Sequence, residues 1–132
     1  MMTRNFKLAL IALTFCSVAS AATTMEKDGV LRDESGRTLY LFAKDEVGKS
    51  NCYDACLAKW PAFMAKADAK PSGDLSLVSR NDGSKQWAWK GKPLYYFAGD
   101  AKVGDTTGDG VAGVWAVIRS GAPAAKTGAS TY

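Results

Sequence analysis

The chain contains no histidine among its 132 residues. Histidine is the usual general base near neutral pH and the commonest zinc and copper ligand, and it is an axial ligand of attached haem. Its absence excludes histidine-dependent catalytic triads and imidazole metal centres together. There is no Cys-x-x-Cys-His motif for haem attachment either. We therefore do not expect an enzyme, and we expect no cofactor.

The amino-terminal apolar stretch is too short to span a membrane. Residues 8–19 form about twelve apolar positions, whereas a spanning helix needs about 20. Arg4 and Lys7 precede this stretch, and the small residues Ala19-Ser20-Ala21 follow it, an order typical of a cleavable secretory signal peptide. The sequence predicts a Sec-type signal over residues 1–21, cleavage after Ala21, and a periplasmic or secreted mature protein.

Cysteine is scarce, with three residues, and Cys16 lies inside the predicted signal. A lipoprotein signal is cut directly before a cysteine that becomes acylated. Here the bulky Phe15 stands where a small residue is needed, so we expect no stable membrane anchor.

An excess of one charge is also missing. Removing Arg4 and Lys7 with the signal leaves 15 basic and 13 acidic residues, so the net charge falls from +4 to +2 (15 − 13). Without a block of basic residues, nucleic-acid binding is not expected. The partner would be an unknown small ligand or an envelope protein.

The chain does contain an internal duplication. Residues 36–45 (Gly-Arg-Thr-Leu-Tyr-Leu-Phe-Ala-Lys-Asp) align with residues 91–100 (Gly-Lys-Pro-Leu-Tyr-Tyr-Phe-Ala-Gly-Asp) at an offset of 55 (91 − 36), and Trp60 and Trp115 keep that offset. Two copies are too few for a solenoid, so we expect them to share one core. The prediction is a small, mainly β single domain with one short helix, made of two related hairpin or meander units.

We place the duplicated domain at residues 22–119, with repeat units at about 29–65 and 75–119. Residues 66–74, which include Pro71-Ser72-Gly73, then form a linker between the two units. Residues 120–132, rich in alanine, glycine, serine and threonine, are expected to be a flexible tail.

The strand predictions rest on apolar runs and turn signals. Residues 39–43 and 94–98 are apolar or aromatic throughout, which favours central strands covered on both faces. Turn residues at 33–36 and 81–83 predict a hairpin in each copy. Residues 86–90 add a further strand, which we expect in the second copy alone.

One helix is predicted in the first copy. Asn51 can cap its start, with Asp54 three residues further on, and residues 52–59 contain ordinary helix formers. Pro61 would end the helix at or before Trp60.

The repeated Tyr-x-Phe-x-x-Asp motif resembles that of the bacterial family called "secreted repeat of unknown function", described as predicted lipoproteins with a Tyr-x-(Phe/Trp/Tyr)-x-x-Asp motif. Gly48-Lys-Ser-Asn-Cys52-Tyr-Asp-Ala-Cys56, Gln86-Trp87 and Gly113-Val-Trp115 extend the resemblance over about residues 29–118. The resemblance implies an exported repeat without an established activity. The motif residues in this chain are Tyr40, Phe42, Asp45, Tyr95, Phe97 and Asp100.

Two departures from the resembled family concern its anchor and its metal chemistry. Many members carry a lipobox, which is missing here, and a histidine after the last tryptophan, where this chain has Ala116. A membrane anchor and a metal role for that histidine are therefore not expected.

The remaining two cysteines leave two readings open. In an oxidising compartment a Cys52–Cys56 disulfide is the default. On an intact helix, residues four apart have Cβ atoms about 5–6 Å apart, whereas a disulfide needs about 3.5–4.5 Å. A regular helix would thus leave two free sulfurs for thiol redox chemistry or for copper, with Met64 as a third ligand.

Two acidic patterns also admit two readings. Asp45 and Asp100 could act as paired catalytic carboxylates, as in glycosidases, but their equivalent positions favour turn-closing roles. Residues 105–110 resemble the opening of a calcium loop. Ala116 stands where the loop needs its twelfth-position glutamate, so a glycine-rich turn is expected.

Four aromatic residues are the candidate binding surface. Trp87 and Trp89 lie on one face of their predicted strand, and with Tyr53 or Tyr96 they could form a stacking platform. The competing reading places these rings in the core, which we favour. The functional hypothesis is an exported, non-enzymatic binding or structural module. The alternative is a thiol-redox or copper-handling protein acting through Cys52 and Cys56.

Overall fold

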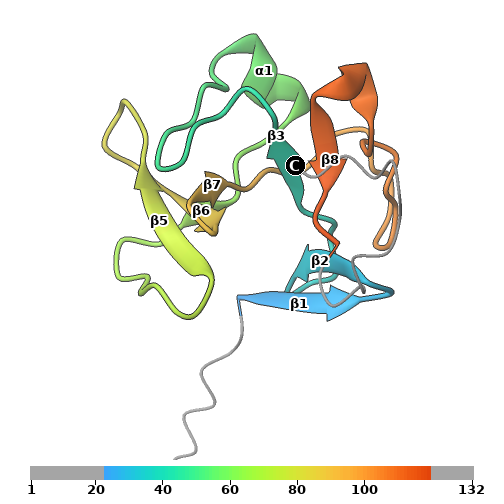
Figure 1. The fold of residues 1–132 in the computed structure, drawn as a ribbon, viewed down its shortest axis with the longest axis horizontal. Helices are drawn as coiled ribbons and strands as arrows, with labels where there is room; N and C mark the ends of the chain where they lie inside the picture. The colour runs from blue at the N-terminus through green and yellow to red at the C-terminus, as the bar shows by residue number, and fades with distance from the viewer. Residues whose placement is uncertain (1–22, 120–132) are drawn as a thin grey trace, which may run out of the picture.

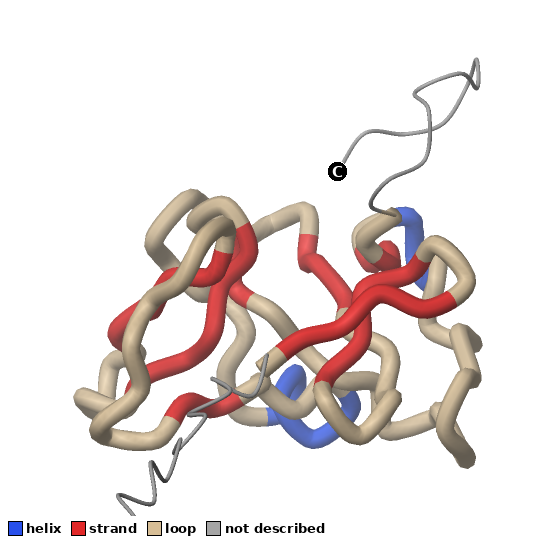
Figure 2. Tube along the Cα trace, turned by 90° about the horizontal axis from the view of Figure 1, so that it is seen from below, coloured by secondary structure: helices blue, strands red, loops and turns tan. Residues whose placement is uncertain are grey.

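The computed structural model describes residues 23–119, so the predicted signal peptide and the predicted tail lie outside the described residues. Between these limits the fold is mainly β with one short α-helix, as predicted, and it also contains one short 3₁₀-helix. Figure 2 shows that loops connect these short elements. Neither helix of residues 23–119 is long and apolar enough to cross a membrane. The elements are β1 (Thr24–Lys27), β2 (Val30–Asp33), β3 (Tyr40–Phe42), α1 (Ala55–Lys59), β4 (Met64–Ala65), β5 (Leu75–Ser79), β6 (Lys85–Trp89), β7 (Lys92–Pro93), η1 (Val111–Gly113) and β8 (Trp115–Val117).

The first repeat begins with the hairpin β1–β2, seen at the lower right of Figure 1. Asp28 and Gly29 both have positive φ (55° and 74°), as a two-residue turn of the mirror-image type requires. The chain then turns again, and Thr38 forms an antiparallel bridge with Arg32. The prediction of a third strand in the second copy alone is therefore wrong. The sequence did not indicate β1, because most of its side chains are exposed and do not alternate between apolar and polar residues.

The second repeat forms the corresponding meander β5–β6–β7, at the left of Figure 1. Its strand β6 matches the strand predicted at residues 86–90 within one residue. Lys90 and Gly91, with φ of 50° and 84°, make the tight turn from β6 to β7.

Each meander is completed by the end of the other repeat. Leu31 N in β2 donates to Ile118 O, directly after β8, at 2.9 Å, and Val30 forms a bridge with Arg119, while β8 itself pairs with β3. In the same way, β4 pairs with β6, and Trp87 N donates to Phe63 O at 2.8 Å. Figure 1 shows β3 and β8 side by side at the centre, although they come from different repeats. The sheet β4–β6–β5 with β7 and the sheet β3–β8 therefore both contain strands from the two repeats, and an isolated bridge between Val30 and Arg119 links β2 to the second repeat.

The two repeats meet at the predicted central segments. Tyr40 N donates to Tyr95 O at 2.8 Å, and Tyr95 N donates to Tyr40 O at 3.0 Å. Leu39, Tyr40, Leu94 and Tyr95 are all completely buried, which confirms that both segments are covered on both faces. Only the first is a strand, however. The second makes isolated bridges at Tyr95, so the predicted strand at 94–98 is not formed.

A stack of four aromatic rings forms the shared core between the repeats. Its order is Phe42, Trp115, Trp60 and Phe97, with centroid separations of 4.3, 3.8 and 4.2 Å. The two central tryptophans are nearly parallel, with an interplanar angle of 3°. Phe42 and Phe97 occupy equivalent positions in the two repeats, and so do Trp60 and Trp115. From either end, the stack therefore begins with a motif phenylalanine, which is followed by the tryptophan of the other repeat.

Helix α1 is shorter than predicted. Asp54 has a positive φ of 53°, which breaks the helical path, so the helix begins at Ala55. Asn51 does not cap it, because its side-chain amide donates to Lys44 O at 2.7 Å instead. The helix ends before Trp60 and Pro61, as the proline predicts.

Candidate functional site

The motif tyrosines and aspartates pair across the repeats. The Tyr40 hydroxyl donates to Asp100 Oδ2 at 2.7 Å, and the Tyr95 hydroxyl donates to Asp45 Oδ2 at 2.6 Å. Burial and the bond to the carboxylate both raise the pKa of each tyrosine, so both hydroxyls remain donors. Each repeat thus supplies the donor for the other repeat's acceptor.

The second oxygen of each aspartate holds the loop that follows it. Asn51 N donates to Asp45 Oδ1 at 2.7 Å, and Thr107 N donates to Asp100 Oδ1 at 2.9 Å. These are the contacts expected of turn-closing aspartates. Burial raises the pKa of Asp45, against the bonds from Tyr95 and Asn51 and the charge of Arg80. Both carboxylates are engaged in holding the fold.

A buried arginine that the sequence did not single out anchors the loop before α1. Arg80 is only 6% exposed. Its guanidinium donates to Ser50 Oγ at 2.9 Å, to Gln86 Oε1 at 2.6 Å and to Cys52 O at 2.6 Å, and it lies 4.3 Å above the Tyr53 ring. This network ties the first repeat to β6, so its role is structural.

Cys52 and Cys56 form a disulfide, with Cα atoms 5.3 Å apart. On an intact helix, two cysteines four residues apart would be too far apart for a disulfide, but Cys52 precedes α1 and is not held in helical geometry. Cys52 is completely buried. Among residues 23–119, no group of three histidine, cysteine, aspartate or glutamate side chains is placed to hold a metal ion.

The four candidate aromatic residues have different environments. Trp87 is 7% exposed and packs in the core with Leu31 and Leu94, so it does not offer its ring faces to a ligand. Trp89, Tyr53 and Tyr96 are half-buried. Arg80 covers Tyr53, and the Arg37 guanidinium lies 3.9 Å above the Tyr96 ring.

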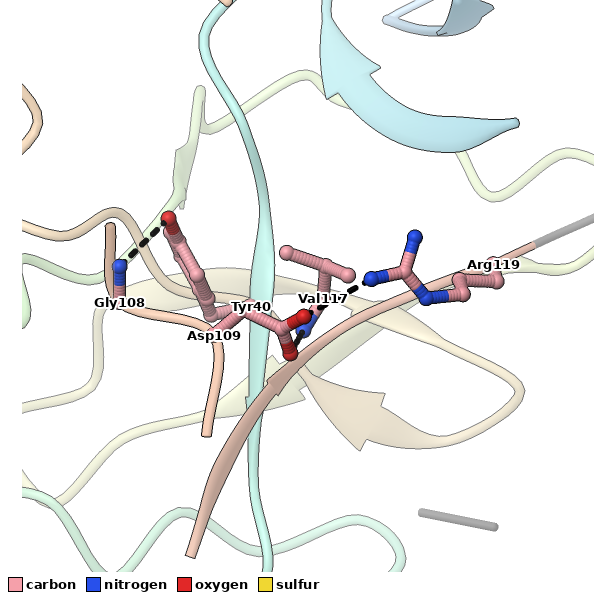
Figure 3. Close-up of polar contacts among 5 residues, drawn as sticks. All are labelled: Tyr40, Gly108, Asp109, Val117 and Arg119. Carbon is pink, nitrogen blue, oxygen red and sulfur yellow. Dashed lines mark hydrogen bonds and ion pairs between the residues drawn. The ribbon is translucent and has the colours of Figure 1, made fainter. Parts of the chain in front are cut away.

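The loop compared with a calcium loop is held by its own carboxylates. Asp105 Oδ2 accepts from Ala101 N at 2.9 Å. Asp109 accepts from Val117 N at 3.1 Å and from the Arg119 guanidinium at 2.8 Å, as Figure 3 shows. Both contacts fasten the loop to the chain around β8, as expected of a structural turn.

A crevice of about 260 Å³ lies between the repeats. The first repeat contributes polar side chains, and the second contributes a loop that starts at its motif phenylalanine. The lining residues are Arg37, Thr38, Phe97, Asp100, Ala101, Lys102 and Val103.

Two polar side chains of this crevice are already engaged. Asp100 is bound through both oxygens. The Thr38 hydroxyl donates to Asp105 O at 2.6 Å and accepts from Arg32 at 2.7 Å. The side chains of Arg37 and Lys102 make no hydrogen bond or ion pair within the described part of the chain. These two cations are the groups of the crevice that are able to bind a ligand.

The model of the family described as "secreted repeat of unknown function" matches residues 22–64 and 76–119. The chain belongs to this family. The comparison with curated proteins found no match, and neither did the comparison with solved structures.

In this secreted repeat the motif has a structural explanation. The tyrosine and aspartate of Tyr-x-Phe-x-x-Asp pair with their counterparts in the other repeat, and the phenylalanine ends the aromatic stack. The motif therefore describes how two repeats join.

Sequence reasoning missed the cations of the crevice, Arg37 and Lys102. Both are exposed residues in the segments between strands, where no periodicity marks a function. The signal that could have found them is the alignment of the two repeats. The loop from Asp100 to Gly104 is one residue longer than the loop from Asp45 to Gly48, and Lys102 lies in it.

Proposed function

We propose that the mature protein is an exported, non-enzymatic binding module whose ligand occupies the crevice between its repeats. One observation carries the proposal: the 260 Å³ crevice places two cations, whose side chains make no hydrogen bond or ion pair among residues 23–119, beside an apolar wall. Small-ligand sites combine apolar surface with a few polar groups in this way. The predicted signal peptide and the family's secreted character support a periplasmic or extracellular location.

A binding role fits the chemistry of the crevice better than a catalytic one. Asp100 is the lining carboxylate, and both its oxygens accept hydrogen bonds from the protein. A general acid or base must be able to reach the reacting proton. A thiol-redox or copper role is not proposed, because both sulfurs are joined in the disulfide.

Nuclear magnetic resonance tests this proposal directly. Mature protein labelled with ¹⁵N would be titrated with a library of small fragments that includes anions, cations and neutral compounds. We expect at least one compound to shift the amides of Arg37, Thr38 and Lys102 in a saturable way. If no compound of any charge class shifts them, the proposal is wrong. A thiol titration of the same sample should find no free thiol.

A further inference from the structure

Because the two repeats are equivalent, the crevice can be compared with the corresponding junction in the same chain. The crevice lies at one of two equivalent junctions and is called the first crevice: here Val103 lies over Gly36, where an added Cβ would come 2.7 Å from Val103 Cγ1. In the equivalent place of the other repeat Val47 lies over Gly91, with a corresponding distance of 2.6 Å. The backbone therefore builds the same junction twice, and differences between the two reflect their side chains.

The side chains at these two junctions differ in charge. The first crevice has Arg37, Lys102 and Asp100, a formal charge of +1. At the equivalent positions the second junction has Lys92, Asp45 and Glu46, a formal charge of −1, and the neighbouring Lys49 forms an ion pair with Glu46 at 3.8 Å. The extra residue of the longer loop brings the second cation, and Ala101 stands where the other loop has Glu46.

A buried cation lies behind the first crevice. Arg32 is 4% exposed, and it donates to Thr38, which lines the crevice. Its Nε has no hydrogen-bond partner, and no ion pair of Arg32 is found within residues 23–119. Because Arg32 is buried and forms no ion pair, its charge would favour an anion in the crevice that Thr38 lines. Behind the second junction the corresponding pair is Ala88 and Pro93.

Arg37 is held ready for a planar anion. Its main-chain N–H donates to Asp33 Oδ1 at 2.9 Å. Its guanidinium lies over Tyr96, whose hydroxyl donates to Asp33 Oδ2 at 2.6 Å. A guanidinium packed against an aromatic ring in this way loses less freedom on binding, and its parallel N–H groups match a carboxylate.

We infer that the crevice binds a small monocarboxylate with a compact apolar body. This inference rests on the proposed function and specifies its ligand class. Arg37 receives the carboxylate, Lys102 supplies the second positive charge, and Phe97 and Val103 contact the apolar part. The limited volume restricts the ligand to a small molecule.

Three probes of the same shape and different charge test the inference. Sodium benzoate, benzamide and benzylamine hydrochloride would each be titrated into the labelled mature protein at low salt and at 150 mM salt. We expect benzoate to bind about tenfold or more tightly than the other two, with the shifts confined to the first crevice and weaker binding in salt.

Matched variants test the two cations. Arg37→Gln and Lys102→Gln should each weaken benzoate binding about tenfold, because each removes a charged hydrogen bond. Lys92→Gln, the equivalent change at the second junction, should leave binding unchanged. The ¹⁵N spectrum of each variant shows whether the fold is retained.

The outcomes separate this inference from the proposed function. Equal binding of benzamide and benzoate, or full benzoate affinity in Arg37→Gln, would overturn the anion inference and leave a binding module in place. Benzoate shifts around Lys92 and Val47 would overturn it as well. A failure of every fragment to shift the crevice amides would overturn both.

Discussion

Val103 lies directly over Gly36, so closely that a Cβ on that glycine would come 2.7 Å from Val103 Cγ1. Gly36 also has a φ of 93°, a conformation that side chains other than glycine rarely adopt. The same relation holds between Val47 and Gly91. Each repeat thus uses a glycine to let the other repeat's valine approach, and this glycine precedes the motif in both copies.

Gly36→Ala should destabilise the protein through both strain and steric overlap. The positive φ alone is worth on the order of 1–3 kcal/mol, and the overlap with Val103 adds to it. Gly104→Ala is the matched control, because its φ is 94° but nothing lies within 4 Å of the added Cβ. Urea denaturation measures both. Equal losses in the two variants would show that the contact with Val103 is unimportant, whereas Val103→Ala should restore part of the stability of Gly36→Ala.

Cutting the linker should leave the two repeats bound to each other. The exchanged strands β4 and β8 and the aromatic stack join the halves without the linker. A protease site inserted between Lys66 and Asp74 would produce two fragments, which we expect to co-elute on gel filtration with an unchanged circular dichroism spectrum. Separate, folded fragments would contradict the exchange of strands. The uncut variant shows whether the insertion itself perturbs the fold.

Loss of the disulfide should lower stability without abolishing the fold. Cys52 and Cys56 are only four residues apart, so the closed loop is small and the bond contributes roughly 2 kcal/mol. For a domain of this size, the double variant Cys52→Ala, Cys56→Ala should melt on the order of 10 °C lower. Thermal denaturation of wild type with and without reductant gives the comparison. A variant unfolded at 25 °C would show that the disulfide holds more than a local turn.

Two aspartates should respond to pH with opposite sign. Burial raises the pKa of Asp33, but bonds from Tyr96, Ser35 and Arg37 outweigh it, and the pKa lies below the ordinary 3.8. The stability contributed by Asp33 is therefore fully present above the unfolded value and is lost as the pH falls through the folded one. Asp33→Asn should cost about 1–3 kcal/mol at pH 7 and progressively less below pH 4.

Asp45 is the control for this effect. Burial raises its pKa above 3.8, so folding favours its protonated form and wild type gains stability as the pH falls through the raised value. The difference in unfolding free energy between wild type and Asp45→Asn should therefore grow on acidification, while that for Asp33→Asn shrinks. Denaturant titrations between pH 3 and pH 7 measure both differences. Parallel behaviour of the two variants would contradict the assignment.

The sequence predicts the duplication, the shared core and the buried central segments, because an offset of 55 and uninterrupted apolar runs are visible in the residues themselves. It does not predict which repeat closes which meander. Phe63 and Ile118 would satisfy the same apolar pattern whether they packed on their own repeat or on the other. The helix start was also unpredictable, since no residue pattern signals the positive φ of Asp54 that delays the helix to Ala55.

The candidate site was less accessible to sequence reasoning than the fold. Aromatic residues such as Trp87 attract attention because they suit both a core and a binding surface, and burial alone separates the two. Arg37 and Lys102 are ordinary surface cations until the fold places them on one crevice. The one sequence feature that indicated a difference between the two junctions was the unequal length of the loops that follow the motif aspartates.

The exchange of β4 and β8 also has a consequence for the two junctions. A chain with a single repeat would lack the strand that completes its own meander, and a second molecule would have to provide it. Two identical single-repeat chains joined in this way would have two identical junctions. Within one chain the two junctions need not be identical, and they differ where one loop has Lys102 and the other has Glu46.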